Sequence, residues 1–235
     1  DNVALEPDVT ALGEVLAGCG ARIEGLGTRR LTIHGVRDLR PIDTTIIPDR
    51  IEAATLLAAA AVTGGSVTIE HCDSGHMAAV MHQLEEMGCD VLPGNAEVNL
   101  VGPARLRATD ITTAPFPGFP TDMQAQMMAL ASIAEGTSII TDTIYFDRFT
   151  HVPELSRLGA QIELKGNAAV IKGVDRLQGA PVMATDIRAS AALVIAALAA
   201  EGETRISRIY HLDRGYEQLE KKLTKLGASI ERVQE

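Results

Sequence analysis

The sequence has no tryptophan, and aromatic residues make up only 3% of its 235 positions. A large core must therefore be filled by aliphatic side chains, and 46% of the residues are hydrophobic. The chain is rich in alanine and also has 21 glycines, a composition typical of helices that approach closely over small side chains. At this length the chain can bury one or two sizeable cores.

Cysteine, positive charge and long apolar runs are also scarce. The three cysteines (Cys19, Cys72 and Cys89) lack the spacing of a disulfide framework, which favours a reducing cytosol. A net charge of −10 argues against nucleic acid as a steady partner, although a few arginines could still bind a small anion. No apolar run reaches the roughly 18 residues of a membrane span, and no targeting segment is recognised. We therefore expect a cytoplasmic protein without nucleic-acid or membrane partners.

The most informative feature present is an internal repeat. Three strongly apolar segments each begin with an Asp and end with a Gly, at residues 49–65, 122–136 and 186–202. From that Gly to the Gly of a later Leu-Gly or Met-Gly step is 23 residues in the first two copies and 25 in the third. A fixed period indicates one supersecondary unit stacked several times. A helix that is apolar on every side must be enclosed, so these segments predict core helices.

Each copy predicts the same succession of elements. The buried helix is followed by a strand, at residues 66–71, 137–143 and 203–209, and then by an amphipathic helix, at residues 76–87, 151–158 and 216–226. A Gly ends each amphipathic helix, and an alternating hairpin follows, as in residues 160–174 around a Gly-Asn turn. The fold class predicted is α/β (α+β), an inside-out α/β barrel of repeated units with buried helices and outer sheets.

Both ends of the chain are incomplete relative to the period. Residues 12–36 match the second half of a further repeat, with a helical stretch ending at Leu16, and the last copy stops short of its second hairpin strand. Segments 37–47 and 103–120, rich in Pro, Thr and Asp, are predicted connections. We therefore expect a piece of a longer protein.

Polar residues gather where the buried helices begin. Thr121 and Gln124 match a capping box, which makes helix capping the first interpretation of Asp122 between them. A helix start also suits a bound anion, so a role in ligand binding is the alternative.

Two arginines are predicted at positions where their charge is electrostatically unfavourable. Arg188 and Arg214 each follow an Asp and are predicted at helix starts, where a cation opposes the helix dipole. A bound anion gripped by the planar guanidinium would reverse that cost, whereas the alternative is a local salt bridge to Asp186 or Asp213. Arg148 is a third candidate.

No metal or cofactor is expected. His71, Cys72 and His76 are too few for a metal centre. From the residues alone, no reaction follows.

Four segments closely resemble the UDP-N-acetylglucosamine 1-carboxyvinyltransferase (enolpyruvyl transferase) family: residues 113–126, 148–160, 182–194 and 208–233. The likeness extends from about Glu6 to the C-terminus. It implies a cytoplasmic bacterial enzyme that transfers the enolpyruvyl group of phosphoenolpyruvate to the 3-hydroxyl of UDP-N-acetylglucosamine, the first committed step of peptidoglycan synthesis. It also implies two inside-out α/β domains of three repeats each, closing over the substrates.

The resemblance assigns roles to residues of this sequence. Asp122 matches the aspartate proposed as general base for the sugar hydroxyl, and Asp186 matches an acidic position beside the reacting centre. Ile144 falls where the family contacts the nucleotide sugar. The family positions that bind the carboxylate and phosphate of phosphoenolpyruvate correspond to Arg148, Arg188 and Arg214.

The sequence lacks the family's mobile loop with its Cys or Asp, the Lys-Asn pair and further arginines. We therefore expect residues 1–47 to end a first domain and residues 48–235 to form most of a second. The absent N-terminal domain would be an obligatory partner, and this chain alone would be inactive. The alternative is a non-catalytic module of the same fold that binds a nucleotide sugar.

Overall fold

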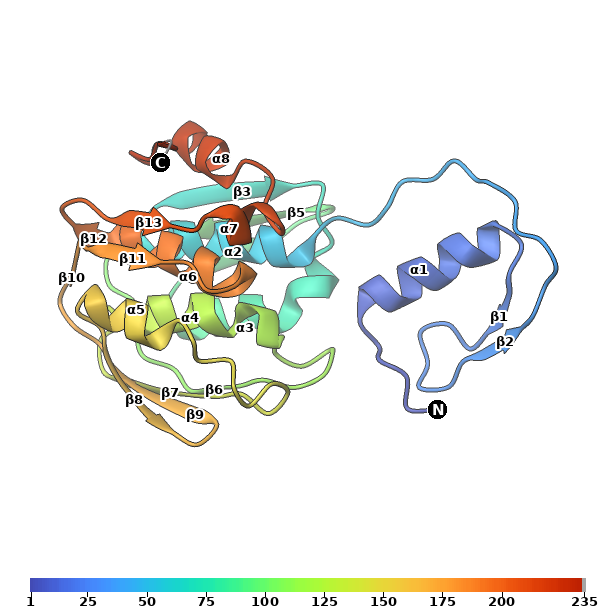
Figure 1. Ribbon diagram of the computed structural model, residues 1–235, viewed down its shortest axis with the longest axis horizontal. Helices are drawn as coiled ribbons and strands as arrows, with labels where there is room; N and C mark the ends of the chain where they lie inside the picture. Colours follow the sequence, from blue (N-terminus) through green and yellow to red (C-terminus); the bar gives the residue numbers. More distant parts are fainter. Residues whose placement is uncertain (234–235) are drawn as a thin grey trace.

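Three buried helices form the centre of the computed structural model, which describes residues 1–233 (Figure 1). They are α2 (Arg50–Val62), α4 (Gln124–Ala131) and α6 (Ile187–Ala199), and they pack against one another. A short 3-10 helix, η2 (Thr121–Met123), leads into α4, all of whose residues are buried. The predicted core helices are thereby confirmed, and small side chains let them approach closely: many of the buried residues of α2 and α6 are alanines.

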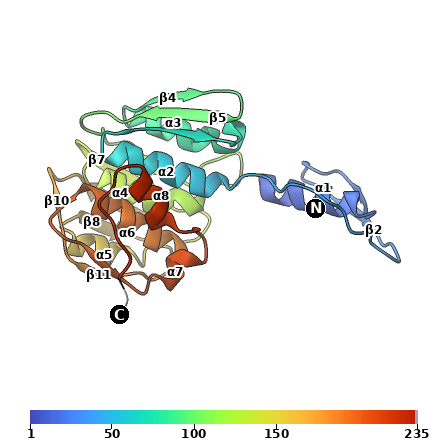
Figure 2. The ribbon, with the colours of Figure 1, turned by 90° about the horizontal axis from the view of Figure 1, so that it is seen from above.

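Sheets lie outside these helices, as the inside-out prediction requires (Figures 1 and 2). One antiparallel sheet has the order β3-β5-β4 and another has the order β6-β7-β9-β8, in which only β6 and β7 are parallel. Two short parallel pairs, β10 with β12 and β11 with β13, cover the third helix. The strands are β3 (Ser66–Glu70), β4 (Asp90–Pro93), β5 (Glu97–Val101), β6 (Ile111–Thr112), β7 (Thr137–Thr141), β8 (Gln161–Lys165), β9 (Ala168–Lys172), β10 (Leu177–Gln178), β11 (Pro181–Met183), β12 (Ala200–Glu201) and β13 (Arg205–Ser207).

A second helix follows the first strand of each copy. These helices are α3 (Ala78–Glu86), preceded by the 3-10 helix η1 (Ser74–Met77), then α5 (Val152–Arg157) and α8 (Leu219–Lys225). The glycines predicted to end them, Gly88, Gly159 and Gly227, all have positive φ angles between 95° and 100°. This left-handed backbone is the conformation that glycine adopts without steric cost, so the prediction is confirmed.

Some boundaries differ from the predictions. The third amphipathic helix begins at Leu219, not at Tyr216, because Gln218 is left-handed (φ 48°) and interrupts it; a four-residue helix, α7 (Tyr210–Asp213), comes before it. The connection 103–120 contains β6, which continues the sheet beside β7. Residues 228–233 form no strand.

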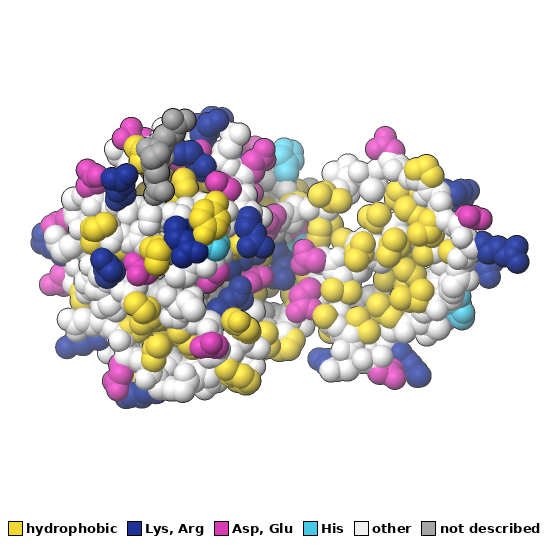
Figure 3. Space-filling view, in the orientation of Figure 1, with side chains coloured by type: hydrophobic (Ala, Val, Ile, Leu, Met, Phe, Trp, Pro, Cys, Tyr) yellow, Lys and Arg dark blue, Asp and Glu magenta, His cyan; other side chains and the backbone are white. Residues whose placement is uncertain are grey.

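Residues 1–47 lie to one side of the rest (Figures 1 and 2). They contain α1 (Pro7–Gly18), which begins before residue 12 and ends two residues after the predicted Leu16, and the antiparallel pair β1 (Arg22–Glu24) and β2 (Thr32–His34). Hydrophobic side chains gather on the face seen in Figure 3. The large exposed hydrophobic residues of this segment are Leu12, Ile33, Val36, Leu39, Ile42 and Ile46. That residues 1–47 end a separate domain stays a prediction.

Within residues 1–233, no helix is both long and apolar enough to cross a membrane.

Candidate functional site

The three buried helices begin at aspartates in equivalent positions of the repeat, and two of these aspartates cap their helix. Asp49 Oδ1 accepts hydrogen bonds from the backbone N–H groups of residues 51 and 52. Asp186 Oδ1 accepts from those of residues 188 and 189 in the same way. These are the side-chain bonds that satisfy free donors at a helix start.

Asp122 is the exception, and its predicted capping role is wrong. The chain enters α4 through a 3-10 turn, in which the backbone N–H groups of residues 123 and 124 already donate to the carbonyls of residues 120 and 121. These i→i+3 bonds occupy donors that a cap would otherwise bind, and neither η2 nor α4 has a side-chain cap. The capping box is not formed either, since Thr121 Oγ1 donates to Asp142 and Gln124 Nε2 contacts Met128 Sδ.

Two arginines hold the Asp122 carboxylate instead. Arg148 Nη2 donates to Asp122 Oδ1 at 2.7 Å, and Arg188 Nε lies 3.5 Å from the same oxygen. Burial raises the pKa of the Asp122 carboxyl, but the charges of Arg188 and Arg148 and their hydrogen bonds together hold this pKa below its usual value. The group is therefore a carboxylate at neutral pH, in contact with two cations whose own side chains are about four-fifths buried (21% and 17% exposed).

Arg188 does not form the local salt bridge to Asp186 that was the alternative interpretation. Its backbone N–H completes the cap, while its guanidinium turns toward Asp122 and donates from Nη1 to the Tyr216 hydroxyl at 3.2 Å. Tyr216 is almost fully buried and also bonds Thr55 Oγ1 at 3.0 Å. Thr55 of α2 and Tyr216, which precedes α8, thus fix Arg188 of α6 beside Asp122.

Arg214 differs from the prediction. It is the C-cap of α7, where a cation favours the helix dipole, so the dipole argument does not apply to it. The alternative interpretation, a salt bridge to Asp213, is not formed either, because Arg232 holds that carboxylate with two hydrogen bonds of 3.0 and 2.6 Å. Arg214 is exposed, and no ion pair is formed by it within residues 1–233. The following residue approaches the start of α6 closely: a Cβ on Gly215 would lie 2.5 Å from Ile187 Cγ2.

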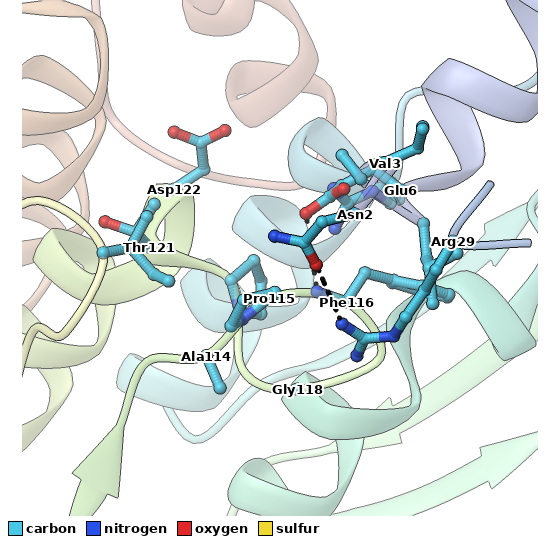
Figure 4. A pocket seen from close by; sticks show the side chains of 15 residues that line it. Asn2, Val3, Glu6, Arg29, Ala114, Pro115, Phe116, Gly118, Thr121 and Asp122 are labelled. Atoms are coloured by element: carbon cyan, nitrogen blue, oxygen red, sulfur yellow. Dashed lines mark hydrogen bonds between the residues drawn. The ribbon is translucent and has the colours of Figure 1, made fainter. Parts of the chain in front are cut away.

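A cavity of about 360 Å³ opens beside Asp122, between residues 1–47 and the body (Figure 4). Asp122 and Ile144 both line it, together with Arg50 and the loop of residues 114–118. From the N-terminal segment, Glu6 Oε1 accepts from the backbone N–H of Phe116 at 3.4 Å. Of the sequence-predicted residues, Asp122 and Ile144 line the cavity, and Arg148 and Arg188 contact Asp122 from outside this lining. Asp186 and Arg214 neither line the cavity nor pair with Asp122 within the described residues.

Within the described residues, no three His, Cys, Asp or Glu side chains gather as metal ligands. Two arginines in contact with one carboxylate can instead bind an anionic group and place a proton acceptor next to it.

Comparison with known proteins places this arrangement in a family. The family model for EPSP synthase (3-phosphoshikimate 1-carboxyvinyltransferase) matches residues 1–223. The chain belongs to this family.

Individual relatives are similar to this chain in sequence as well as in fold. The UDP-N-acetylglucosamine 1-carboxyvinyltransferases of Dichelobacter nodosus and Myxococcus xanthus are 57% and 55% identical over 100% and 99% of this chain. The crystal structure of the enolpyruvyl transferase NikO from Streptomyces tendae has a TM-score of 0.87 and 34% identity over 98% of this chain. The chain spans about half the length of the curated relatives it matches, 55–56%, and 55% of the NikO chain. These similarities confirm the predicted resemblance and fold.

Two further residues belong to this site, and the sequence pattern does not single them out. Tyr216 falls inside a predicted helix, and its place two residues after Arg214 is the only sequence signal for it. Asp142 directly follows a strand in a polar run and is completely buried. The sequence signal for it was an acidic residue at a strand end, a position where functional side chains often lie.

Proposed function

We propose that the longer protein to which this chain belongs transfers the enolpyruvyl group of phosphoenolpyruvate to the 3-hydroxyl of UDP-N-acetylglucosamine. The observation that carries the proposal is Asp122, which is released from helix capping, ionised and held by two arginines at the edge of a cavity. The names of the Dichelobacter nodosus and Myxococcus xanthus relatives support the nucleotide sugar, rather than shikimate 3-phosphate, as the acceptor.

In this proposal Asp122 accepts the proton of the sugar hydroxyl as its oxygen bonds to C2 of phosphoenolpyruvate, while C3 takes up a proton. Phosphate then leaves from C2 as C3 loses a proton, which restores the double bond in the enolpyruvyl product. Arg148 and Arg188 bind the carboxylate and phosphate of phosphoenolpyruvate, and Arg214 joins them when the site closes. Ile144 contacts the nucleotide sugar, which its place in the cavity wall supports. Asp186 lies at the start of α6 and is the acidic residue placed beside the reacting centre. Its Oδ2 accepts from Thr150 Oγ1 at 3.2 Å.

We further propose that residues 1–47 end a first domain, whose preceding part covers the exposed apolar face of this segment. Large exposed apolar patches mark interaction surfaces. The reaction would take place in the cytoplasm of a bacterium and begin peptidoglycan synthesis. Catalysis needs groups positioned from both sides of the substrates, so residues 1–235 alone should be inactive.

Phosphate release from phosphoenolpyruvate tests the proposal, with the full-length protein and with residues 1–235. We expect turnover with UDP-N-acetylglucosamine by the full-length protein and none by residues 1–235. Turnover with shikimate 3-phosphate in its place would overturn the substrate assignment. Tight binding of the nucleotide sugar without any turnover would identify a non-catalytic binding module. Full activity of residues 1–235 would overturn the role given to the first domain.

A further inference from the structure

Asp142 is a completely buried carboxylate, and among the described residues it forms no ion pair with a basic side chain. Hydrogen-bond donors surround it instead. Its Oδ1 accepts from Thr113 Oγ1 at 2.8 Å and from the backbone N–H groups of residues 144 and 145 at 2.9 Å each. Its Oδ2 accepts from Thr121 Oγ1 at 2.6 Å. Although burial raises the pKa of the Asp142 carboxyl, these four bonds together hold it below its usual value. A buried charge satisfied in this way fixes the groups that donate to it.

Thr121 connects this carboxylate to Arg148. A hydroxyl has one proton, and Thr121 donates it to Asp142, so the lone pairs of its oxygen face other donors. Arg148 Nη1 donates to that oxygen at 3.0 Å, while Nη2 of the same guanidinium donates to Asp122 at 2.7 Å. The two ends of the planar fork are therefore held at two fixed acceptors, which sets the orientation of the guanidinium plane.

Asp142 also shapes the backbone that carries Arg148. The N–H groups of Ile144 and Tyr145 turn inward to Asp142 Oδ1, and the backbone N–H of Arg148 then donates to the carbonyl of Tyr145 at 3.2 Å. One buried carboxylate thus orders both the turn from which Arg148 projects and the hydroxyl that receives its side chain.

We propose that Asp142 and Thr121 are positioning residues that hold Arg148 in the orientation in which it binds the anionic part of phosphoenolpyruvate. This inference rests on the proposed function of the site, because the anion that Arg148 binds is taken from it.

The chain offers a matched pair of variants for the test. Thr121→Val and Thr113→Val each remove one hydroxyl donor from Asp142, but only Thr121 contacts Arg148. Phosphoenolpyruvate is titrated into the full-length protein in the presence of UDP-N-acetylglucosamine, and thermal unfolding is measured for each variant.

Thr121→Val should weaken phosphoenolpyruvate binding roughly 5- to 50-fold, the scale of leaving one buried donor of a charged group unpaired. Thr113→Val should lower the unfolding temperature without a comparable loss of binding. Thr121→Ser keeps the hydroxyl and should recover most of the affinity lost in Thr121→Val. If Thr121→Val does not fold, Asp142→Asn serves in its place. Its amide oxygen can still accept the three bonds at Oδ1, while its NH2 faces Thr121 and disrupts only the fourth.

Arg148→Ala separates this inference from the proposed function. If Arg148→Ala leaves phosphoenolpyruvate binding unchanged, Arg148 is not an anion ligand, and both the inference and that part of the proposed function are wrong. If Arg148→Ala weakens binding but Thr121→Val does not, or if Thr113→Val weakens it equally, the positioning inference alone is overturned.

Discussion

Replacing Asp122 by Asn should have two opposite effects, a slower reaction and tighter binding of phosphoenolpyruvate. Asn keeps the shape of the side chain and an oxygen that accepts from Arg148, but it cannot take up the proton of a hydroxyl. In the substrate-free protein the carboxylate of Asp122 also occupies the two arginines proposed to bind the substrate anion. An incoming anion must compete with it, and Asn removes much of that competition.

The magnitudes follow from the contacts. Loss of a positioned general base lowers the chemical step by about 10²- to 10⁴-fold. A hydrogen bond to a charged group contributes about 1.5–3 kcal/mol and a neutral one about 0.5–1.5 kcal/mol, so the competing interaction weakens by about 1–1.5 kcal/mol. The Asp122 side chain is 37% exposed, and solvent screening favours the lower end of this range. Phosphoenolpyruvate should therefore bind roughly 5- to 10-fold more tightly.

The assay compares kcat for phosphate release with the dissociation constant of phosphoenolpyruvate, both in the full-length protein. Asp49→Asn is the matched control, because Asp49 occupies the same repeat position but caps its helix, and Asn caps as well as Asp does. Because the charge of Asp49 also acts on Arg188, the control should change both quantities far less than Asp122→Asn does. A near-normal kcat in Asp122→Asn would leave Asp122 only as a charge partner of the arginines. Unchanged or weaker phosphoenolpyruvate binding would refute the competition between substrate and carboxylate.

Three further predictions concern neighbouring groups. Tyr216→Phe removes the acceptor of Arg188 Nη1 and a hydrogen bond to Thr55, so the free energy of unfolding in denaturant should fall by about 1–3 kcal/mol. An unchanged unfolding midpoint would contradict this network. Arg214→Lys keeps the charge but loses the planar fork, so phosphoenolpyruvate should bind about 1–3 kcal/mol more weakly in a titration with the nucleotide sugar present; unaffected binding would make Arg214 a surface residue. Burial lowers the pKa of His151 to about 4 from an ordinary 6.5, so the unfolded chain binds the extra proton and stability is lost as the pH falls from 6.5 to 4, by roughly 3 kcal/mol. His151→Leu should make the unfolding midpoint less dependent on pH between 4 and 6.5. An equally steep pH dependence in this variant would show that other groups cause it.

The architecture could be predicted from the sequence because its signals are local and repeated. The apolar helices, the closing glycines and the alternating hairpins each depend on neighbouring residues, and three copies of one pattern reinforce one another. Boundaries were less certain where a single residue changed the backbone. Gln218, for instance, adopts a left-handed conformation inside a segment whose pattern is continuously helical.

The site could be predicted only in part, because it depends on contacts distant in the sequence. The pattern around Asp122 is that of a helix cap, and nothing local indicates that backbone i→i+3 bonds have already taken the donors. Arg188 has a nearby carboxylate at Asp186, yet its guanidinium reaches Asp122, 66 positions away along the chain. Arg214 does not pair with the adjacent Asp213, because Arg232 from the C-terminal segment binds that carboxylate.

The unequal use of the three helix-start aspartates determines which substitutions each position would tolerate. At residue 49 a side chain needs only an oxygen that reaches two backbone N–H groups, so Asn, Ser or Thr can replace Asp at a small cost in stability. At residue 122 no helix depends on the side chain, so the fold would accept a wider range of polar residues there. The proposed chemistry would accept far fewer, because only an ionised carboxylate both pairs with two arginines and takes up a proton. Saturation mutagenesis scored separately for folding and for turnover would therefore rank these two positions in opposite order, even though they are equivalent copies within one repeat.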